Sequence, residues 1–355
     1  MDFIHNTNVK SERVYGKELN KEVFLSIVVP TYKRVDLLRK CLRSIIKQNP
    51  VSEIIYEILV VSNDPEFDYN NLNLKLDPEI FSIYVNKENL GMCGNMNRCA
   101  LLASGQYVAY IQDDDFLMPN FIETIEQLKK NNLLNRVDCL IPNRYYWMKN
   151  SSEKFGEKAL RHMRMKDIAS QIIRIGKSPE FLQQLFPAHT INTMYTSYSG
   201  GPTCGITFDR KSLIESGGFN QEYPYGFDYV FFTEFSEHFR TYLLNEFVSV
   251  YRTENSATNR PEVQLDFFHA KYDYLIMHRD SNEFISNNIN TLTACYYDVF
   301  PDKVKYLINE RYSIPNIPNW KKSCFRLLAD IRLYRSGVYR RKPCPENVIQ
   351  WYKSL

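Results

Sequence analysis

Short apolar runs alternate with amphipathic stretches between residues 24 and 143. The runs are rich in Val, Ile, Leu, Phe and Tyr and are bounded by turn residues, which is typical of buried strands. We therefore expect strands at 24–30, 54–64, 81–89, 106–112 and 137–143. In the stretches between them apolar side chains recur at helical spacing, which predicts helices at 34–48, 96–105 and 119–132.

This alternation predicts an α/β fold, Rossmann-like, with a mostly parallel central sheet flanked by helices. In such sheets ligands bind beyond the carboxyl ends of the strands. The polar clusters of this part of the chain follow the predicted strands, and they read "TYKR", "SND", "KENLG" and "DDD". We therefore expect these clusters to meet at one edge of the sheet and to form a ligand site there.

The remaining segments carry weaker patterns. Residues 225–239 predict an aromatic-rich helix, residues 239–252 predict a strand, and the chain from Arg260 onward reads as helical. The polar N-terminus predicts a tail or a first helix, and residues 144–200 read as helical and basic-aromatic. We divide the chain into an N-terminal segment 1–22, a central domain 23–258 with halves 23–143 and 144–258, and a helical C-terminal region 259–355.

The composition is that of a globular protein, with 44% hydrophobic residues and a net charge of +3, which is too balanced to indicate nucleic-acid binding. The eight cysteines form neither a C-x-x-C pair nor a zinc-ligand spacing, which is typical of reduced thiols in a reducing compartment. The N-terminus lacks the pattern of a signal peptide, and no apolar stretch reaches about 18 residues. We therefore expect a cytoplasmic protein whose contact with a membrane would be peripheral.

Three consecutive carboxylates, Asp113, Asp114 and Asp115, follow the strand predicted at 106–112. Mg²⁺ is held in proteins by one or two carboxylates, with waters and substrate phosphates completing its shell. A bound cation would also remove the repulsion between the three charges. The alternative is a solvated acidic turn that caps the helix beginning near Pro119. The position at the ligand edge of the sheet favours the cation site.

Two loops at the same edge carry groups suited to a nucleotide. In the loop after the first strand, Thr31 can donate to a phosphate, Tyr32 can stack on a base, and Lys33 or Arg34 can neutralise phosphate charge. After the second strand, Asn63 and Asp64 could contact a base edge or a ribose. A plain strand-to-helix loop and an Asx turn are the corresponding structural alternatives.

Further candidate site residues each rest on a single local feature of the sequence. Gly91, after Asn89, would let the backbone approach a ligand closely. Asp228, at the start of a predicted helix, could serve as a general base, or it could be an acid favoured by the helix dipole. On that helix Glu234 and His238 are four residues apart, a spacing that suits a metal but is more typical of a surface pair.

Five motifs in order resemble the family 2 glycosyltransferases with the GT-A fold, over roughly residues 23–258. They read "SIVVPTYKR", "EILVVSND", "NLGMCGNMNRCALLASGQYVAYIQDDDFLMP", "GGPTCGITFDRKSLIESGGFN" and "FDYVFFTEF". The sequence departs from the family pattern at three places. Ser62 and Asn63 replace an Asp pair, Met96 stands where an Arg often precedes Asn97, and Gln112 replaces the first acid of the DXD region.

The resemblance implies a role for each matching residue. Asp228 would be the catalytic base, and Asp114 with Asp115 would hold Mg²⁺ or Mn²⁺. Gly201, Pro202 and Thr203 would contact the acceptor. The nucleotide-sugar would be bound by Pro30, Thr31, Tyr32, Arg34, Asn63, Asp64, Asn89, Gly91, Asn97 and Asp113.

The implied activity is inverting transfer of a sugar from a nucleotide-diphosphate-sugar donor to a hydroxyl of a glycan or lipid-linked acceptor, in the synthesis of a bacterial surface polysaccharide. A sugar nucleotidyltransferase is a second hypothesis, although that class carries a Gly-rich basic loop after the first strand and "PTYKR" has no Gly. A degenerate sugar-nucleotide or membrane-binding module is a third, against which the retention of Asp114 and Asp228 argues.

The segment "NWKKSCFRLLADIRLYRSGVYRRKP" near the C-terminus combines apolar residues at helical spacing with eight basic residues and a single acid, Asp330. It predicts a helix that lies on an anionic membrane surface. The alternative, a helix that packs on the central domain and exposes a solvated basic face, is the more typical structure for such a run of charges.

Overall fold

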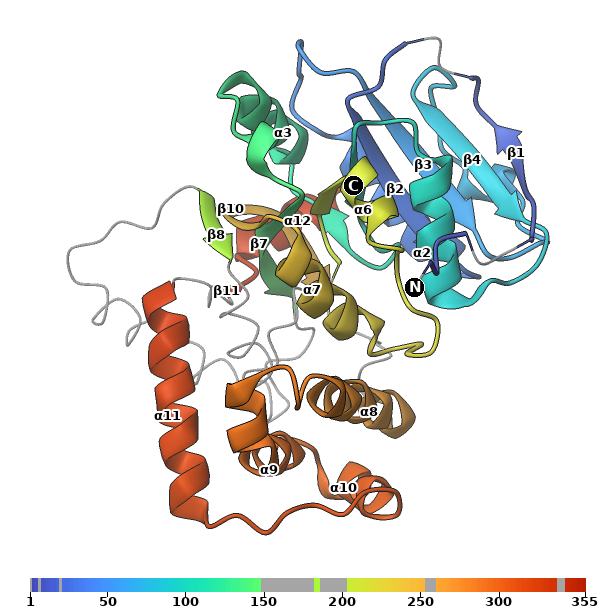
Figure 1. Ribbon diagram of the computed structural model, residues 1–355. Helices are drawn as coiled ribbons and strands as arrows, with labels where there is room; N and C mark the ends of the chain where they lie inside the picture. The colour runs from blue at the N-terminus through green and yellow to red at the C-terminus, as the bar shows by residue number, and fades with distance from the viewer. Residues whose placement is uncertain are drawn as a thin grey trace.

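The computed structural model describes residues 2–5, 8–18, 21–147, 182–185, 203–252, 260–336 and 342–355 (Figure 1). One mixed sheet runs through the molecule, in the strand order β1-β4-β3-β2-β5-β9-β7-β10-β6. Its first half contains the four parallel strands expected from the sequence, which are β2 (Leu25–Thr31), β3 (Tyr56–Ser62), β4 (Phe81–Asn86) and β5 (Tyr107–Tyr110). The carboxyl ends of these strands therefore share one edge, as predicted.

The N-terminal segment differs from the expectation of a tail or helix, because β1 (Ser11–Tyr15) pairs antiparallel with β4. The strand has no apolar run, and only Val14 and Tyr15 pack against the core, so its sequence carries little strand signal.

The second half of the sheet is mixed. β9 (Ile206–Asp209) runs antiparallel to both β5 and β7 (Cys139–Trp147), and β7 pairs in parallel with β10 (Thr241–Arg252). Short strands complete it: β6 (Phe116–Leu117) and β8 (Leu182–Leu185) pair with β10, and β11 (Lys342–Pro343) pairs with β7. Where residues 144–200 are described, the helical interpretation is wrong, because 144–147 belong to β7 and 182–185 form β8. The rest of that interpretation lies outside the described residues.

Helices cover both faces of the sheet. α1 (Val35–Ile46) and α3 (Phe121–Lys130) pack on one face, where alternate residues of β2 such as Ile27 and Val29 point. α2 (Gly91–Leu102) and α7 (Phe227–His238) pack on the other face, with α6 (Arg210–Glu215) beside α2. α2 begins five residues earlier than its sequence pattern predicts, at a glycine with φ of +70°.

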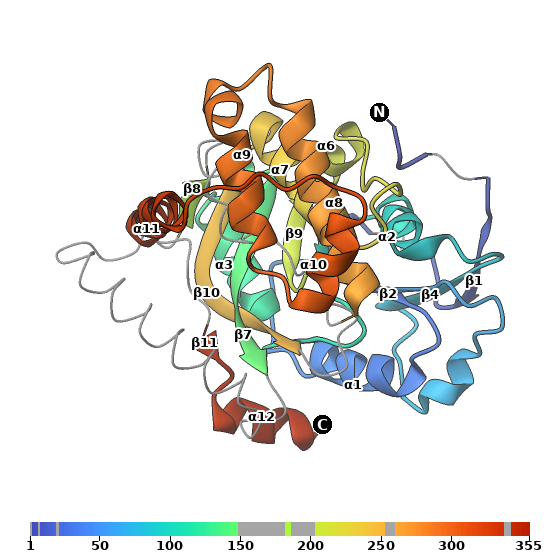
Figure 2. The same cartoon turned by 90° about the horizontal axis from the view of Figure 1, so that it is seen from below.

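The C-terminal region is helical, as expected. Its helices are α8 (Pro261–Met277), α9 (Glu283–Tyr297), α10 (Asp302–Asn309), α11 (Asn319–Ser336) and α12 (Glu346–Lys353). α8 and α9 share a core with α7, to which Tyr274 and Leu292 contribute. Figures 1 and 2 show α8–α11 gathered together, whereas α12 lies apart from them near the end of β7. Among the described helices, none has the length and apolar character needed to cross a bilayer.

Candidate functional site

The polar residues predicted to lie at the carboxyl ends of the strands meet there, and Asp113 is at their centre. The Thr31 hydroxyl donates to Asp113 Oδ2 at 2.6 Å, and the Arg34 guanidinium lies 2.6 Å from Asp113 Oδ1. The side chain of Asp113 is completely buried. Burial raises the pKa of Asp113 to about 6, even though the charge of Arg34 acts in the opposite direction. Asp113 therefore ties the loop after β2 to the turn after β5.

Asp114 is the most accessible of the three carboxylates, with 24% of its side chain exposed. Arg34 donates to its Oδ2 at 2.9 Å, so one guanidinium bridges Asp113 and Asp114. Next to this bridge Tyr32 is 42% exposed, and Lys33 adopts a φ of +55°, which is rare for a residue with a side chain.

Asp115 is buried and is held from the end of β10. The backbone N–H of Arg252 donates to Asp115 Oδ1 at 2.9 Å, and the Arg252 side chain donates from Nε to the backbone oxygen of Asp114. The second carboxylate oxygen, Oδ2, is buried and has no hydrogen-bond partner. Burial raises the pKa of Asp115 well above its ordinary value, and the neighbouring charge of Asp114 adds to the effect.

The donor set of this turn fits a hard divalent cation. Its carboxylate oxygens are the ligands that Mg²⁺ and Mn²⁺ take, and Asp115 retains a buried oxygen without a partner. Within the described part of the chain no group of three His, Cys, Asp or Glu residues forms a closed metal cage. Such a cation would therefore take the rest of its ligands from water and phosphate, and Asp114 is the accessible carboxylate that would hold it.

The amides at the ends of β3 and β4 are joined to each other. Asn63 Oδ1 accepts hydrogen bonds from the side chain of Asn86 and from the backbone N–H of Leu90, and Asn63 Nδ2 donates to the backbone oxygen of Gly91. Asn86 donates in turn to Asn95. Asn63 is buried, and it shapes the turn that begins α2.

Three other residues that were predicted to bind the nucleotide-sugar lie near the surface at the same edge of the sheet. Asp64 is partly buried, and its Oδ1 accepts a hydrogen bond from the N–H of Glu66, which is the Asx turn proposed as the structural alternative. Asn89 and Gly91 are exposed, and a Cβ added at Gly91 would meet no atom within 4 Å. The backbone at Gly91 is therefore open to a ligand.

Asn97 lies in a different environment. Its Oδ1 accepts from the backbone N–H of Phe219 at 2.8 Å, and its Nδ2 donates to the backbone oxygens of Phe219 and Phe3. The side chain is 1% exposed. A Cβ added at Gly218 would lie 2.5 Å from Asn97 Oδ1, so the turn is closed tightly over this amide. The hydrogen bonds of Asn97 therefore hold the turn before α7 in place.

Asp228 lies in the first turn of α7 and is partly buried. Its Oδ1 accepts from the backbone N–H of Tyr229 at 2.7 Å. Burial raises the pKa of Asp228 to about 6, and the positive charges of Lys271 and Arg144 limit the rise. The charge of Arg144 also limits the rise in the pKa of the buried Cys204 thiol. The charge of Arg144 thus lowers the pKa of both the Asp228 carboxyl and the Cys204 thiol.

The remaining candidates from the sequence are the three predicted acceptor contacts and the pair of side chains on α7. Thr203 is buried, and its hydroxyl accepts from Gln112 Nε2 at 2.6 Å, which ties it to the end of β5; Gly201 and Pro202 lie outside the described residues. Glu234 and His238 are both exposed on α7. The residues that sequence reasoning missed are Arg144, Arg252 and Lys271. Of these, Arg252 carried a local signal, as a basic residue at the end of a predicted strand.

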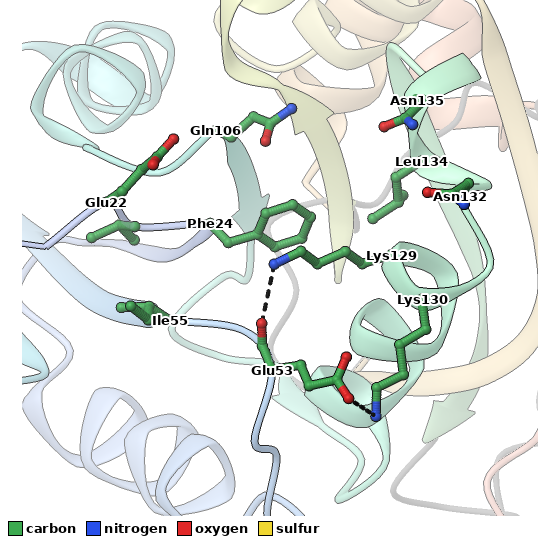
Figure 3. A pocket seen from close by; sticks show the side chains of 11 residues that line it. Glu22, Phe24, Glu53, Ile55, Gln106, Lys129, Lys130, Asn132, Leu134 and Asn135 are labelled. Carbon is green, nitrogen blue, oxygen red and sulfur yellow. Dashed lines mark hydrogen bonds and ion pairs between the residues drawn. The ribbon is translucent and has the colours of Figure 1, made fainter.

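A separate pocket of about 560 Å³ lies where β2, β3 and β5 begin, at the edge of the sheet opposite to the carboxylate turn (Figure 3). Lys129 and Lys130 reach into it from α3, and both contact Glu53. Lys130 pairs with the Glu53 carboxylate, whereas Lys129 donates to the Glu53 backbone oxygen and lies over the Phe24 ring.

Comparisons with known proteins agree with this architecture. Residues 26–199 match the family model described as Glycosyl transferase family 2. The chain is 29% identical over 204 residues to a GalNAc(5)-diNAcBac-PP-undecaprenol beta-1,3-glucosyltransferase of Campylobacter jejuni, which covers 56% of this chain and 55% of that protein. It is 32% identical over 133 residues to the glycosyltransferase GlyA of Streptococcus pneumoniae, covering 36% of this chain and 18% of that protein. The chain thus spans about half the length of the first curated relatives it matches, or less.

Among solved structures, the S. aureus TarS 1-349 complex with UDP-GlcNAc is similar with a TM-score of 0.54 at 13% identity. The match covers 89% of this chain and 83% of that one. At this level of identity the likeness concerns the fold, and it confirms the predicted GT-A architecture.

Proposed function

Because residues 26–199 of the chain belong to glycosyl transferase family 2, we propose that the protein is an inverting, metal-dependent glycosyltransferase. It moves a sugar from a nucleotide-diphosphate-sugar donor to a hydroxyl of a glycan or lipid-linked acceptor, in the synthesis of a bacterial surface polysaccharide. The observation that carries the proposal is the cluster of Thr31, Arg34 and the Asp113–Asp115 turn at the carboxyl ends of the parallel strands. This cluster suits a diphosphate and its cation, and Asp228 in the first turn of α7 supplies a base.

Asp228 acts as the general base. With a pKa near 6 its carboxylate is mostly ionised at neutral pH, yet it is a better proton acceptor than an ordinary aspartate. It takes the proton of the acceptor hydroxyl as the oxygen forms its bond to the anomeric carbon. The bond from that carbon to the diphosphate breaks on the opposite face, so a single displacement inverts the configuration.

The opposite side of the site receives the leaving diphosphate. Arg34 contributes a fixed positive charge, and the hydroxyl of Thr31 and the carboxylate of Asp113 hold the Arg34 loop in place. A bound Mg²⁺ or Mn²⁺, held by Asp114 with Asp115 beside it, supplies further charge neutralisation. Tyr32, Asp64, Asn89 and Gly91 surround the space for the nucleotide.

Asn63 and Asn97 have a different part in this proposal from the one that the family resemblance implies. Their amides are buried and already hydrogen-bonded to the backbone at Leu90 and Phe219. We therefore assign Asn63 to shaping the turn that begins α2 and Asn97 to holding the turn before α7.

The test is a panel of nucleotide-diphosphate sugars incubated with the full chain and Mn²⁺ or Mg²⁺, with release of nucleoside diphosphate as the readout. We expect one donor to be hydrolysed slowly and the release to stop with EDTA. Pyrophosphate release from a nucleoside triphosphate would identify a nucleotidyltransferase instead. Binding of a donor without any turnover, across metals and acceptors, would identify a degenerate binding module.

The proposed site of action is the inner face of the cell membrane, with α11 as the contact. One face of α11 packs on α9, because Lys322 and Arg326 both pair with Asp298. On another face Trp320 and Leu327, seven residues apart, are 70% and 61% exposed. An aromatic and an aliphatic side chain on a basic helix suit the interface of an anionic bilayer.

Co-sedimentation with liposomes of anionic and of neutral lipid tests this contact. We expect binding only to the anionic liposomes, and we expect it to weaken when Trp320 and Leu327 are both changed to Ser. A double variant that sediments like the parent protein would exclude α11 as the contact.

A further inference from the structure

The last 14 residues return to the carboxylate turn. β11 pairs in parallel with β7 at Tyr145 and Tyr146, and the N–H of Cys344 donates to the oxygen of Tyr146 at 2.9 Å. α12 follows and packs at the end of β7, away from the other C-terminal helices (Figure 2). This places the end of the chain beside β6, the strand that directly follows Asp115.

The central contact is a stacked pair of rings. Tyr352 of α12 lies parallel to Phe116, with 4.1 Å between ring centroids and 14° between ring planes. Trp147 and Trp351 pack around Phe116, with centroids 6.1 and 6.2 Å away. Since Phe116 is adjacent to Asp115 in the chain, one peptide unit separates the ring that Tyr352 contacts from the carboxylate turn.

A second contact reaches the same turn. The Arg252 guanidinium lies over the Tyr352 ring, 5.6 Å from its centroid, while Arg252 donates to Asp115 from its backbone N–H and to the Asp114 carbonyl from Nε. The Tyr352 ring therefore confines the side chain of Arg252, which holds the Asp114 carbonyl, while the backbone of the same residue holds Asp115. The Tyr352 hydroxyl is buried without a hydrogen-bond partner, so the ring itself makes these contacts.

We propose that the C-terminal segment Lys342–Leu355 is part of the donor-phosphate site, which comprises Thr31, Arg34 and Asp113–Asp115, and that Tyr352 is a positioning residue of this site. Tyr352 holds the carboxylate turn through Phe116 and through Arg252. This inference rests on the proposed glycosyl transfer. It adds that the cation and diphosphate affinity of the site depends on a helix more than two hundred residues away in the chain.

The test compares Tyr352→Leu with Tyr352→Phe in the full chain, with Tyr306→Leu as the control because Tyr306 is an exposed tyrosine on α10. Two of the three tryptophans, Trp147 and Trp351, adjoin Phe116, so tryptophan emission can follow Mn²⁺ titrated in the presence of UDP or GDP. Donor KM, kcat and Tm are measured on the same samples.

We expect Tyr352→Leu to weaken Mn²⁺ binding about 10-fold or more, as is typical when a partner behind a metal ligand is removed. Donor KM should rise with it, and kcat at saturating Mn²⁺ should recover. Tyr352→Phe and the control should resemble the parent protein. If Tyr352→Leu does not fold, Val348→Ala loosens the same helix with a smaller change, and we expect it to weaken Mn²⁺ binding in the same direction.

A lower Tm in a folded Tyr352→Leu or Val348→Ala variant whose Mn²⁺ affinity and donor KM are those of the parent would mean that α12 only stabilises the fold, and it would overturn the inference. Equal losses in Tyr352→Phe and Tyr352→Leu would overturn the role of the ring. If the parent protein itself neither binds Mn²⁺ with a nucleotide nor turns over a donor, the proposed function is wrong. That result differs from a failure of the role of α12, in which the parent protein is active and the variants match it.

Discussion

The carboxylate of Asp266 in α8 accepts a hydrogen bond from the backbone N–H of Gly226 at 2.8 Å, and Gly226 is the N-cap residue of α7. The same oxygen accepts from Tyr225 N–H, also at 2.8 Å. A Cβ at Gly226 would lie 2.6 Å from that of Ala270, so α8 meets the start of α7 without room for a side chain. The C-terminal region thereby sets the position of Asp228, two residues further on.

Removal of this contact should slow the chemical step. We expect Asp266→Ala to lower kcat about 10-fold, because a small displacement of a base costs reaction rate, and to leave donor KM unchanged. Steady-state kinetics with varied donor measures both values. Asp302→Ala removes a fully exposed acid from α10 and serves as the control. A rise in donor KM with unchanged kcat would contradict the role assigned to Asp266.

Replacement of the base itself should have the largest effect. Asp228→Asn keeps the shape of the side chain but cannot accept the proton, so we expect transfer to fall about 10²- to 10⁴-fold. Nucleoside-diphosphate binding, measured by calorimetry with Mn²⁺, should match that of the parent protein. Near-normal turnover in this variant would show that Asp228 is not the general base.

The pH dependence of kcat/KM should report the same group. Burial raises the pKa of Asp228 to about 6, and only its ionised form accepts a proton, so the rate should rise with pH through that region and then level off. Lys271 is buried nearby and lowers this pKa by its charge. In Lys271→Met the acid limb should therefore move to higher pH. If the acid limb of the kcat/KM profile lies at the same pH in Lys271→Met as in the parent protein, another group, such as Asp113, determines that limb.

Two of the three neighbouring carboxylates, Asp114 and Asp115, should respond differently to amide substitution. Asp114→Asn should abolish metal-stimulated turnover with little change in Tm, because its side chain is partly exposed. Asp115→Asn should lower Tm as well, since this side chain is buried and holds Arg252. Thermal unfolding and Mn²⁺ titration of both variants separate the two effects. A larger Tm loss in Asp114→Asn than in Asp115→Asn would reverse this assignment.

Asn97 distinguishes a structural role from donor binding. Because its amide bonds to Phe219 are buried, Asn97→Ala should destabilise the protein by about 1–3 kcal/mol. Donor KM should stay at the parent value. Urea unfolding and donor kinetics measure the two quantities, with Asn309→Ala on α10 as a control. An increase in donor KM without loss of stability would restore the role that the family resemblance implies.

Much of the ligand edge was predictable because the information is local. The apolar runs at β2, β3, β4 and β5 identify strands, and parallel strands necessarily present their carboxyl ends together. The positions of Thr31, Arg34 and Asp113–Asp115 at one place follow from that rule. The local pattern was too weak at two places. A tail or helix was expected where the structure has β1, and α2 begins earlier than expected, at Gly91.

The sequence by itself determined the α/β architecture, the helical C-terminal region and the strand ends from which the candidate groups come, since periodicity and chain order encode these features. Only the tertiary structure decided which of these side chains are accessible to a ligand and which are already used in contacts within the protein. Arg252 holds Asp115 across 137 residues and Asn97 holds Phe219 across 122, and Tyr352 reaches Phe116 from the far end of the chain. Such contacts depend on how distant elements pack, and no local spacing records them.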